Sequence, residues 1–117
     1  MPKLYVRNLT KGTVLATAAD VADTSQKRRT GLLHHTSLAE GEGLWIAPCE
    51  GIHTFFMKFA IDVVFLDRDR NVLKARAGMG PWRLALCLPA QSVLELPAGT
   101  LAATRTERGD QLRFEQA

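Results

Sequence analysis

The sequence has too few cysteines for a disulfide framework and no apolar segment long enough to span a bilayer. Its 117 residues include only Cys49 and Cys87, so free thiols are expected, with a single disulfide as the alternative in an exported protein. The chain opens on a short alternating segment instead of an apolar core followed by a cleavage site, so no signal peptide is evident. We expect a cytoplasmic protein, or an exported one if a leader has been removed from this chain.

The sequence also lacks the short motifs of common nucleotide-binding and hydrolytic sites. It contains no Gly-x-Ser-x-Gly elbow, Walker loop or dinucleotide glycine fingerprint. A Cys-x-x-Cys pair, typical of structural zinc sites, is missing too. We therefore expect neither a metal nor a cofactor. The net charge of +3 is mild, and the single basic cluster Lys27-Arg28-Arg29 gives little support to a nucleic-acid partner.

What is present is the composition of one soluble globular domain. Hydrophobic residues make up 46% of the chain and charged residues 23%, close to the averages for such proteins. A chain of this length buries enough surface to form a stable core without disulfides or a structural metal. We expect a single domain over residues 1–117, with no membrane span.

Short alternating segments separated by turn signals predict a β-rich fold. One helix is expected from Thr24 to Leu33, capped by Asp23, with Gly31 marking either a packing contact or the helix end. A second short helix is expected over residues 100–106. The predicted fold class is α+β and β-rich, a small barrel-like, mostly antiparallel sheet with one or two short helices. The expected strands are 4–8, 13–18, 43–47, 54–58, 61–66, 72–77, 84–88, 92–96 and 111–115. Segments 54–58 and 61–66 form either two strands or one bent strand.

The longest apolar run, from His53 to Asp67, contains two charged residues, Lys58 and Asp62. A buried charge is costly unless it is paired or hydrogen-bonded, so this run is the first place to look for a site. His53 adds a side chain that titrates near neutral pH. In a straight strand Lys58 and Asp62 would lie about 13 Å apart on one face, so they can meet only if the chain bends. The alternative is structural, with Lys58 reaching solvent and Asp62 accepting backbone hydrogen bonds.

Cys49 and His53 form a second candidate site, because a thiol and an imidazole can take part in catalysis or bind a metal. They could form a thiol and imidazole pair, or supply a metal site together with His34 and His35. Neither spacing is specific for such a site. Glu95, in the otherwise apolar segment 92–96, either points outward or pairs with a basic residue such as Arg29 or Lys58.

Four blocks stand in a fixed order: Arg29-Thr30-Gly31-Leu32-Leu33 followed by Leu38, Gly43-Leu44-Trp45-Ile46, His53 to Asp67, and Val93 to Gly99 with Gly109-Asp110. Together they resemble one known family, domain of unknown function 192, also called uncharacterised protein family 0127. The resemblance implies a compact, β-rich, barrel-like single domain found in bacteria and archaea, with no agreed activity. Where the family commonly has Trp-Met-Lys-Asn-Thr, this chain has Phe56-Met57-Lys58-Phe59-Ala60, which removes two polar residues beside the candidate site.

These observations favour a binding or accessory domain over an enzyme, because polar residues stand in apolar strands without a recognisable nucleophile arrangement. Its groove would take a small polar or anionic ligand or a peptide segment. The alternative is a small hydrolase or transferase that uses His53 with Asp62 or Cys49. The predicted groove residues are Arg29, His53, Met57, Lys58, Asp62 and Glu95.

Overall fold

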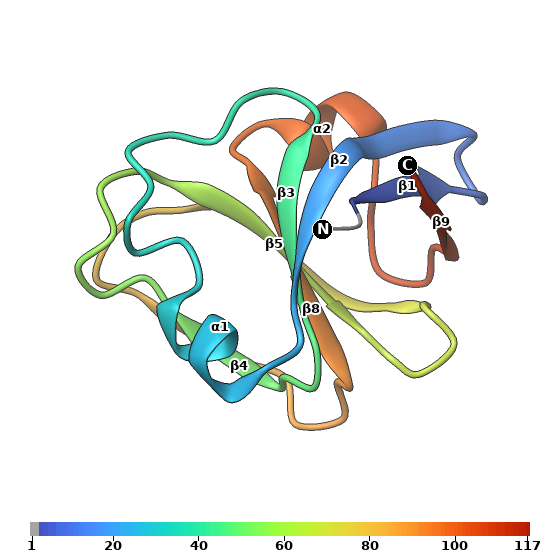
Figure 1. Ribbon diagram of the computed structural model, residues 1–117. Helices are drawn as coiled ribbons and strands as arrows, with labels where there is room; N and C mark the ends of the chain where they lie inside the picture. Colours follow the sequence, from blue (N-terminus) through green and yellow to red (C-terminus); the bar gives the residue numbers. More distant parts are fainter. Residues whose placement is uncertain (1–2) are drawn as a thin grey trace.

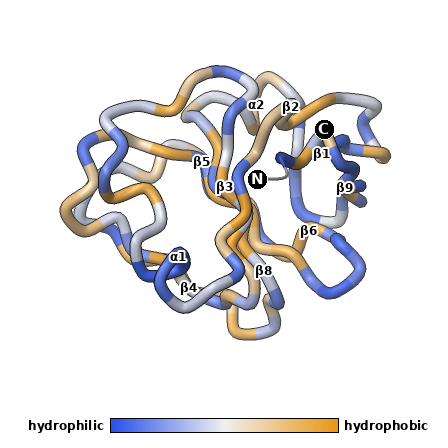
Figure 2. The backbone as a smooth tube through the Cα atoms, in the orientation of Figure 1, coloured by the Kyte–Doolittle hydropathy of each residue, from blue (hydrophilic) through white to orange (hydrophobic). Residues whose placement is uncertain are grey.

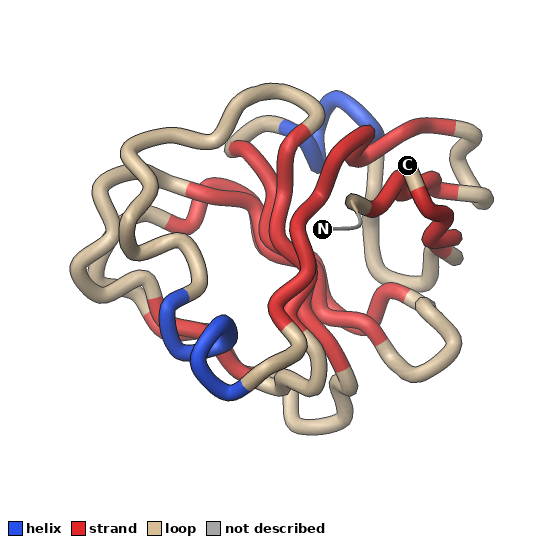
Figure 3. Tube along the Cα trace, in the orientation of Figure 1, coloured by secondary structure: helices blue, strands red, loops and turns tan. Residues whose placement is uncertain are grey.

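The computed structural model describes residues 3–117, in which a curled β-sheet carries two short helices at its periphery (Figures 1 and 3). The β-rich α+β class predicted from the sequence is therefore confirmed. Neither helix of these residues is long and apolar enough to cross a membrane. The elements are β1 (Leu4–Asn8), β2 (Thr13–Ala22), α1 (Ser25–Thr30), β3 (Glu42–Ile46), β4 (Gly51–His53), β5 (Ile61–Leu66), β6 (Val72–Met79), β7 (Leu84–Leu86), β8 (Ser92–Pro97), α2 (Thr100–Thr104) and β9 (Leu112–Gln116).

Seven strands form the main sheet in the order β6-β5-β8-β3-β2-β1-β9, and β4 pairs separately with β7. All neighbours in the main sheet are antiparallel except β2 and β3. The sheet curls until its two outer strands meet at their beginnings. There Val72 donates its backbone N–H to Asp110, and Leu112 donates to Arg70. The result is the barrel-like sheet that the sequence predicts.

The neighbouring strands β5 and β8 are buried on both faces, as the apolar run at 61–66 predicts. Successive side chains point to opposite faces of a strand. Val63 and Val93 accordingly pack into the core beneath α1 and β4, while Val64 and Leu94 pack into the core inside the curl. Figure 2 shows the apolar colouring concentrated where the strands cross the middle of the molecule.

Helix α1 begins one residue later and ends earlier than predicted. Its N-cap is Thr24, whose hydroxyl accepts a hydrogen bond from the backbone of Lys27, and not Asp23. Gly31 ends the helix with φ 49°, donating its N–H to the Lys27 carbonyl. Because a positive φ favours glycine, Gly31 marks the helix end, one of its two predicted roles.

The predicted strand over residues 54–58 is wrong. These residues form a turn after β4, because the side chain and backbone of Thr54 are used to hold a neighbouring loop. Thr54 is fully buried; its hydroxyl donates to the Gly80 carbonyl and accepts from the Arg83 N–H at 2.9 Å. Phe56 then adopts φ 66°, which no extended strand allows.

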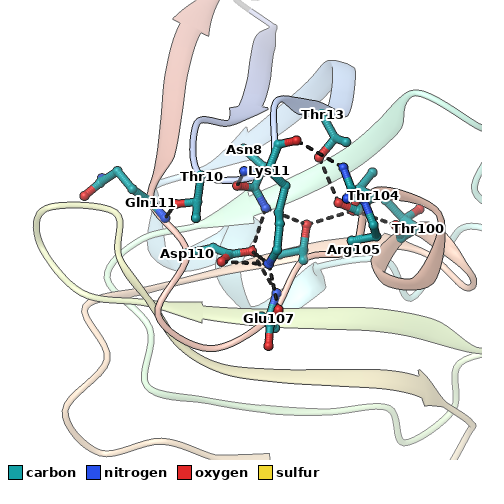
Figure 4. A network of polar contacts seen from close by, with 11 residues as sticks. Asn8, Thr10, Lys11, Thr13, Thr100, Thr104, Arg105, Glu107, Asp110 and Gln111 are labelled. Atoms are coloured by element: carbon teal, nitrogen blue, oxygen red, sulfur yellow. Dashed lines mark hydrogen bonds and ion pairs between the residues drawn. The ribbon is translucent and has the colours of Figure 1, made fainter.

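A polar network joins the β1–β2 turn to the segment between α2 and β9 (Figure 4). Asn8 is 1% exposed, and its amide donates to Asp110 at 2.9 Å and Thr106 at 3.0 Å while its oxygen accepts the Lys11 N–H. Lys11 forms ion pairs with Asp110 and Glu107. Every polar group of Asn8 is thus satisfied, which fits a structural network better than a binding site.

Candidate functional site

A cavity of about 370 Å³ lies between α1, the segment from β3 to β4, and β8. Four of the six predicted groove residues line it: Arg29, His53, Met57 and Glu95. They come from separate parts of the chain, namely α1, β4, the following turn and β8. The volume falls in the range of small-ligand pockets, roughly 300–1,000 Å³.

Glu95 is the unusual member of this set. It stands in β8 between its sheet neighbours Leu44 of β3 and Val63 of β5, is 4% exposed and lines the cavity. Its carboxylate has no hydrogen-bond or ion-pair partner within residues 3–117, and its oxygens are not fully enclosed by protein atoms. Burial raises the pKa of Glu95 to about 7, so the carboxyl group titrates near neutral pH.

The rim of the cavity supplies positive charge from the last turn of α1. Arg29 is exposed and makes no hydrogen bond or ion pair within the described residues, whereas Arg28 donates to the Asp23 carbonyl at 3.0 Å. Both arginines line the cavity. A buried acid and an unpaired guanidinium therefore border the same space.

His53 lies at the edge of the cavity with its ring stacked on Phe55, the ring centroids 4.9 Å apart. Its Nδ1 accepts the backbone N–H of Phe55 at 3.3 Å. Cys49 also lines the cavity, but its thiol donates to the Gly51 carbonyl. Burial, with a smaller contribution from Glu95, raises the pKa of the Cys49 thiol, which disfavours the nucleophilic thiolate.

In residues 3–117, no hydrogen bond joins His53 to either partner proposed for the hydrolase alternative, Cys49 or Asp62. That alternative stays a prediction without a specific contact in its favour. The same residues contain no cluster of three or more His, Cys, Asp or Glu side chains suited to a metal ion. Cys49 and Cys87 are free and partly buried.

Lys58 and Asp62 do not line the cavity. Lys58 is exposed. Asp62 is fully buried, and its carboxylate accepts the backbone N–H groups of Gly78, Gly99 and Leu101. Asp62 shares its face of β5 with Val64 and Leu66, which pack inside the curl, so it lies across the sheet from Glu95.

Arg28 and Cys49 line the cavity but are not among the predicted groove residues. The available signal for Arg28 was its position beside Arg29 in the predicted helix, because both residues belong to the last helical turn. A larger hollow of about 870 Å³ lies between β2 and α2. Its only charged lining residue, Glu40, is exposed, so it lacks the buried, unpaired group that distinguishes the first cavity.

Comparisons with known proteins place this architecture in a family. The chain resembles a UPF0127 protein from Thermococcus sibiricus at 35% identity over 92% of this chain and 73% of the relative. A UPF0127 protein from Pyrococcus furiosus is 30% identical over 93% of this chain and 97% of the relative.

Two crystal structures share the fold at low sequence identity. A protein of unknown function from Novosphingobium aromaticivorans superposes with a TM-score of 0.81 at 22% identity, over 97% of this chain and 84% of the other. A putative transcription regulator from Sinorhizobium meliloti gives 0.84 at 19%, over 97% and 92%. The model of DUF192, described as uncharacterized ACR, matches residues 6–114. The chain therefore belongs to the DUF192 family, as the order of its sequence blocks indicates.

Proposed function

We propose that this protein is a noncatalytic binding domain whose cavity between α1 and β8 holds a small polar ligand. The observation that carries the proposal is Glu95, a residue only 4% exposed that lines the cavity and whose carboxyl group lacks a partner within residues 3–117. A buried polar group without a hydrogen bond is destabilising, so its retention needs a reason. A ligand that hydrogen-bonds Glu95 when bound supplies one.

The charges around the cavity define the chemistry of the ligand. Glu95 calls for a hydrogen-bond donor, such as an amine or hydroxyl, at the floor of the cavity. Arg29 at the rim calls for an anionic group such as a carboxylate or phosphate, which guanidinium binds in a bidentate manner. Met57 and Ile52 add apolar lining. Small zwitterionic or polar anionic molecules, including the end of a peptide, match this set.

A thermal-shift screen with amino acids, dipeptides and small phosphate esters tests the proposal. A ligand present at about 100 times its Kd stabilises a protein by about 2.7 kcal/mol, which corresponds to a rise in Tm of roughly 10 °C for a domain of this size. Hits would then be titrated by calorimetry against wild type, Glu95→Gln and Arg29→Gln. We expect each variant to bind at least tenfold more weakly.

Glu50→Gln and Arg108→Gln are the matched controls, because both residues are exposed and neither lines the cavity. They should bind each hit as wild type does. The proposal fails if no compound in the screen raises Tm, or if the hits bind equally well to Glu95→Gln and Arg29→Gln.

A further inference from the structure

A second surface, on the two-stranded sheet and the turn that follows β4, exposes large apolar side chains. We call it the aromatic–leucine patch, formed by Phe55, Phe56, Trp82, Leu84, Leu86 and Leu88, which are between 37% and 71% exposed. Together they present apolar surface on the order of several hundred Å², at or above the largest patch on an ordinary monomer.

The aromatic members of the patch contact one another, and two of its leucines lie on one face of β7 beside them. The Trp82 ring lies 5.7 Å from Phe55 and 4.6 Å from Phe56, measured between centroids. Leu84 pairs across the sheet with His53, whose ring stacks on Phe55. Leu86 points to the same face as Leu84, since Ala85 between them is buried, and Leu88 lies two residues further along.

The backbone holds the two aromatic residues at the centre of the patch in an uncommon conformation. Phe56 has φ 66° and Trp82 has φ 64°, in the left-handed region where bulky residues are rarely found. Their turns are fastened to each other, because Trp82 donates its N–H to the Thr54 carbonyl. Strained backbone of this kind is typically retained at functional sites, here by presenting two rings to solvent.

The charged side chains beside the aromatic end of the patch are positive. Residues 51–61 and 70–94, which supply the patch, contain neither Asp nor Glu. Lys58 and Arg83 are exposed next to the aromatic residues. Lys74 and Arg76 reach from β6 to the outer edge of β7, donating to the carbonyls of Leu86 and Leu84. The nearest acidic residue along the chain, Glu50, precedes β4 at the Leu86 end.

We propose that the aromatic–leucine patch binds the surface of an anionic lipid membrane. Aromatic and leucine side chains enter the interface between headgroups and acyl chains, while lysine and arginine side chains contact acidic headgroups. The leucines favour lipid over single-stranded nucleic acid, which binds through free aromatic rings; here the rings already stack on one another. This surface lies outside the ligand cavity and its role goes beyond the proposed binding function.

Co-sedimentation of the full chain with vesicles of phosphatidylcholine, with and without phosphatidylglycerol, tests the proposal. We expect binding that needs phosphatidylglycerol and weakens with added salt. The double variant Phe56→Ser with Leu88→Ser removes two of the most exposed apolar side chains and should reduce partitioning at least tenfold. Leu9→Ser is its matched control, 52% exposed on the β1–β2 turn, far from β4 in Figure 1, and should bind as wild type does.

Charge variants give a second readout that does not depend on apolar contacts. Lys58→Gln and Arg83→Gln should each weaken binding about fivefold, the effect of one basic residue near an anionic surface, whereas Arg108→Gln should not. Glu95→Gln should leave vesicle binding unchanged, which separates this surface from the cavity. The proposal is overturned if wild type does not bind anionic vesicles, or if the patch variants bind them as wild type does. It is also overturned if polyuridine RNA, and not the vesicles, binds through these residues.

Discussion

Replacing Glu95 by glutamine should stabilise the folded protein at neutral and higher pH and have little effect in acid. The carboxyl group has a pKa of about 7 in the folded protein against an ordinary value of 4.5. Because folding raises this pKa, the folded chain holds the proton more tightly than the unfolded chain. The stability linked to that proton is fully present below pH 4.5 and is lost as the pH rises through about 7.

The size of the effect follows from the difference between the two pKa values. Each pKa unit corresponds to about 1.4 kcal/mol, so the difference between the folded and unfolded pKa values of Glu95 corresponds to about 3 kcal/mol. Glutamine stays neutral throughout, so the free energy of unfolding of Glu95→Gln relative to wild type should rise by about this amount across the interval. Above a pH of about 7, the difference in the free energy of unfolding between Glu95→Gln and wild type should stay constant. A gain of this size would be large for a single substitution.

Urea unfolding of both proteins at a series of pH values, followed by circular dichroism and tryptophan fluorescence, measures the difference directly. Agreement of the two probes checks that unfolding is two-state. The same change at exposed Glu50 controls for the loss of one carboxylate. A difference between wild type and Glu95→Gln that is flat with pH, or that falls as pH rises, would refute the reasoning, because it would mean that the ionised carboxylate is already stabilised in the free protein.

Two further predictions concern stability. Asp62→Ala should lower the free energy of unfolding by about 3 kcal/mol or more, since it removes the acceptor of three backbone N–H groups at a fully buried position; a loss below about 1 kcal/mol in urea unfolding would contradict this. For Asp110, burial alone would raise the pKa, but hydrogen bonds from Asn8, Lys11 and Glu107 outweigh it and hold the pKa below 3.8. Asp110→Asn should therefore destabilise the protein by about 1–3 kcal/mol at neutral pH, and the gap to wild type should narrow as the pH falls below 3.8. A gap independent of pH would argue against this account.

The candidate site was predictable from the sequence in part. Glu95 attracted attention as a single charge in an apolar strand, and Arg29, His53 and Met57 through the blocks around them; all four line one cavity. The role of Asp62 could not be decided from composition, because the same carboxylate can serve a ligand or cap backbone donors. The amides that it accepts belong to residues 16 to 39 positions later in the chain, a distance over which sequence patterns carry no geometric information.

The error at residues 54–58 has the same origin. His53-Thr54-Phe55-Phe56-Met57 has the β-branched and aromatic composition of a strand, and local propensity offers no reason to break it. The buried hydroxyl of Thr54, bonded to Gly80 and Arg83, overrides that propensity through a long-range contact. The turn that results places Met57 against the cavity and leaves Phe56 exposed.

The sequence by itself predicted most of the strands, the short helices, the order of the family blocks and the presence of two carboxyl groups in apolar surroundings. Those features follow from local periodicity and from the cost of burying charge, and both can be inferred from the amino-acid sequence alone. Only the tertiary structure decided that Asp62 and Glu95 lie on opposite faces of one sheet. Residue alternation separates faces within each strand, but strand pairing and the curl of the sheet fix which face meets α1 and which meets α2. For that reason one carboxylate holds the fold together while the other borders a cavity.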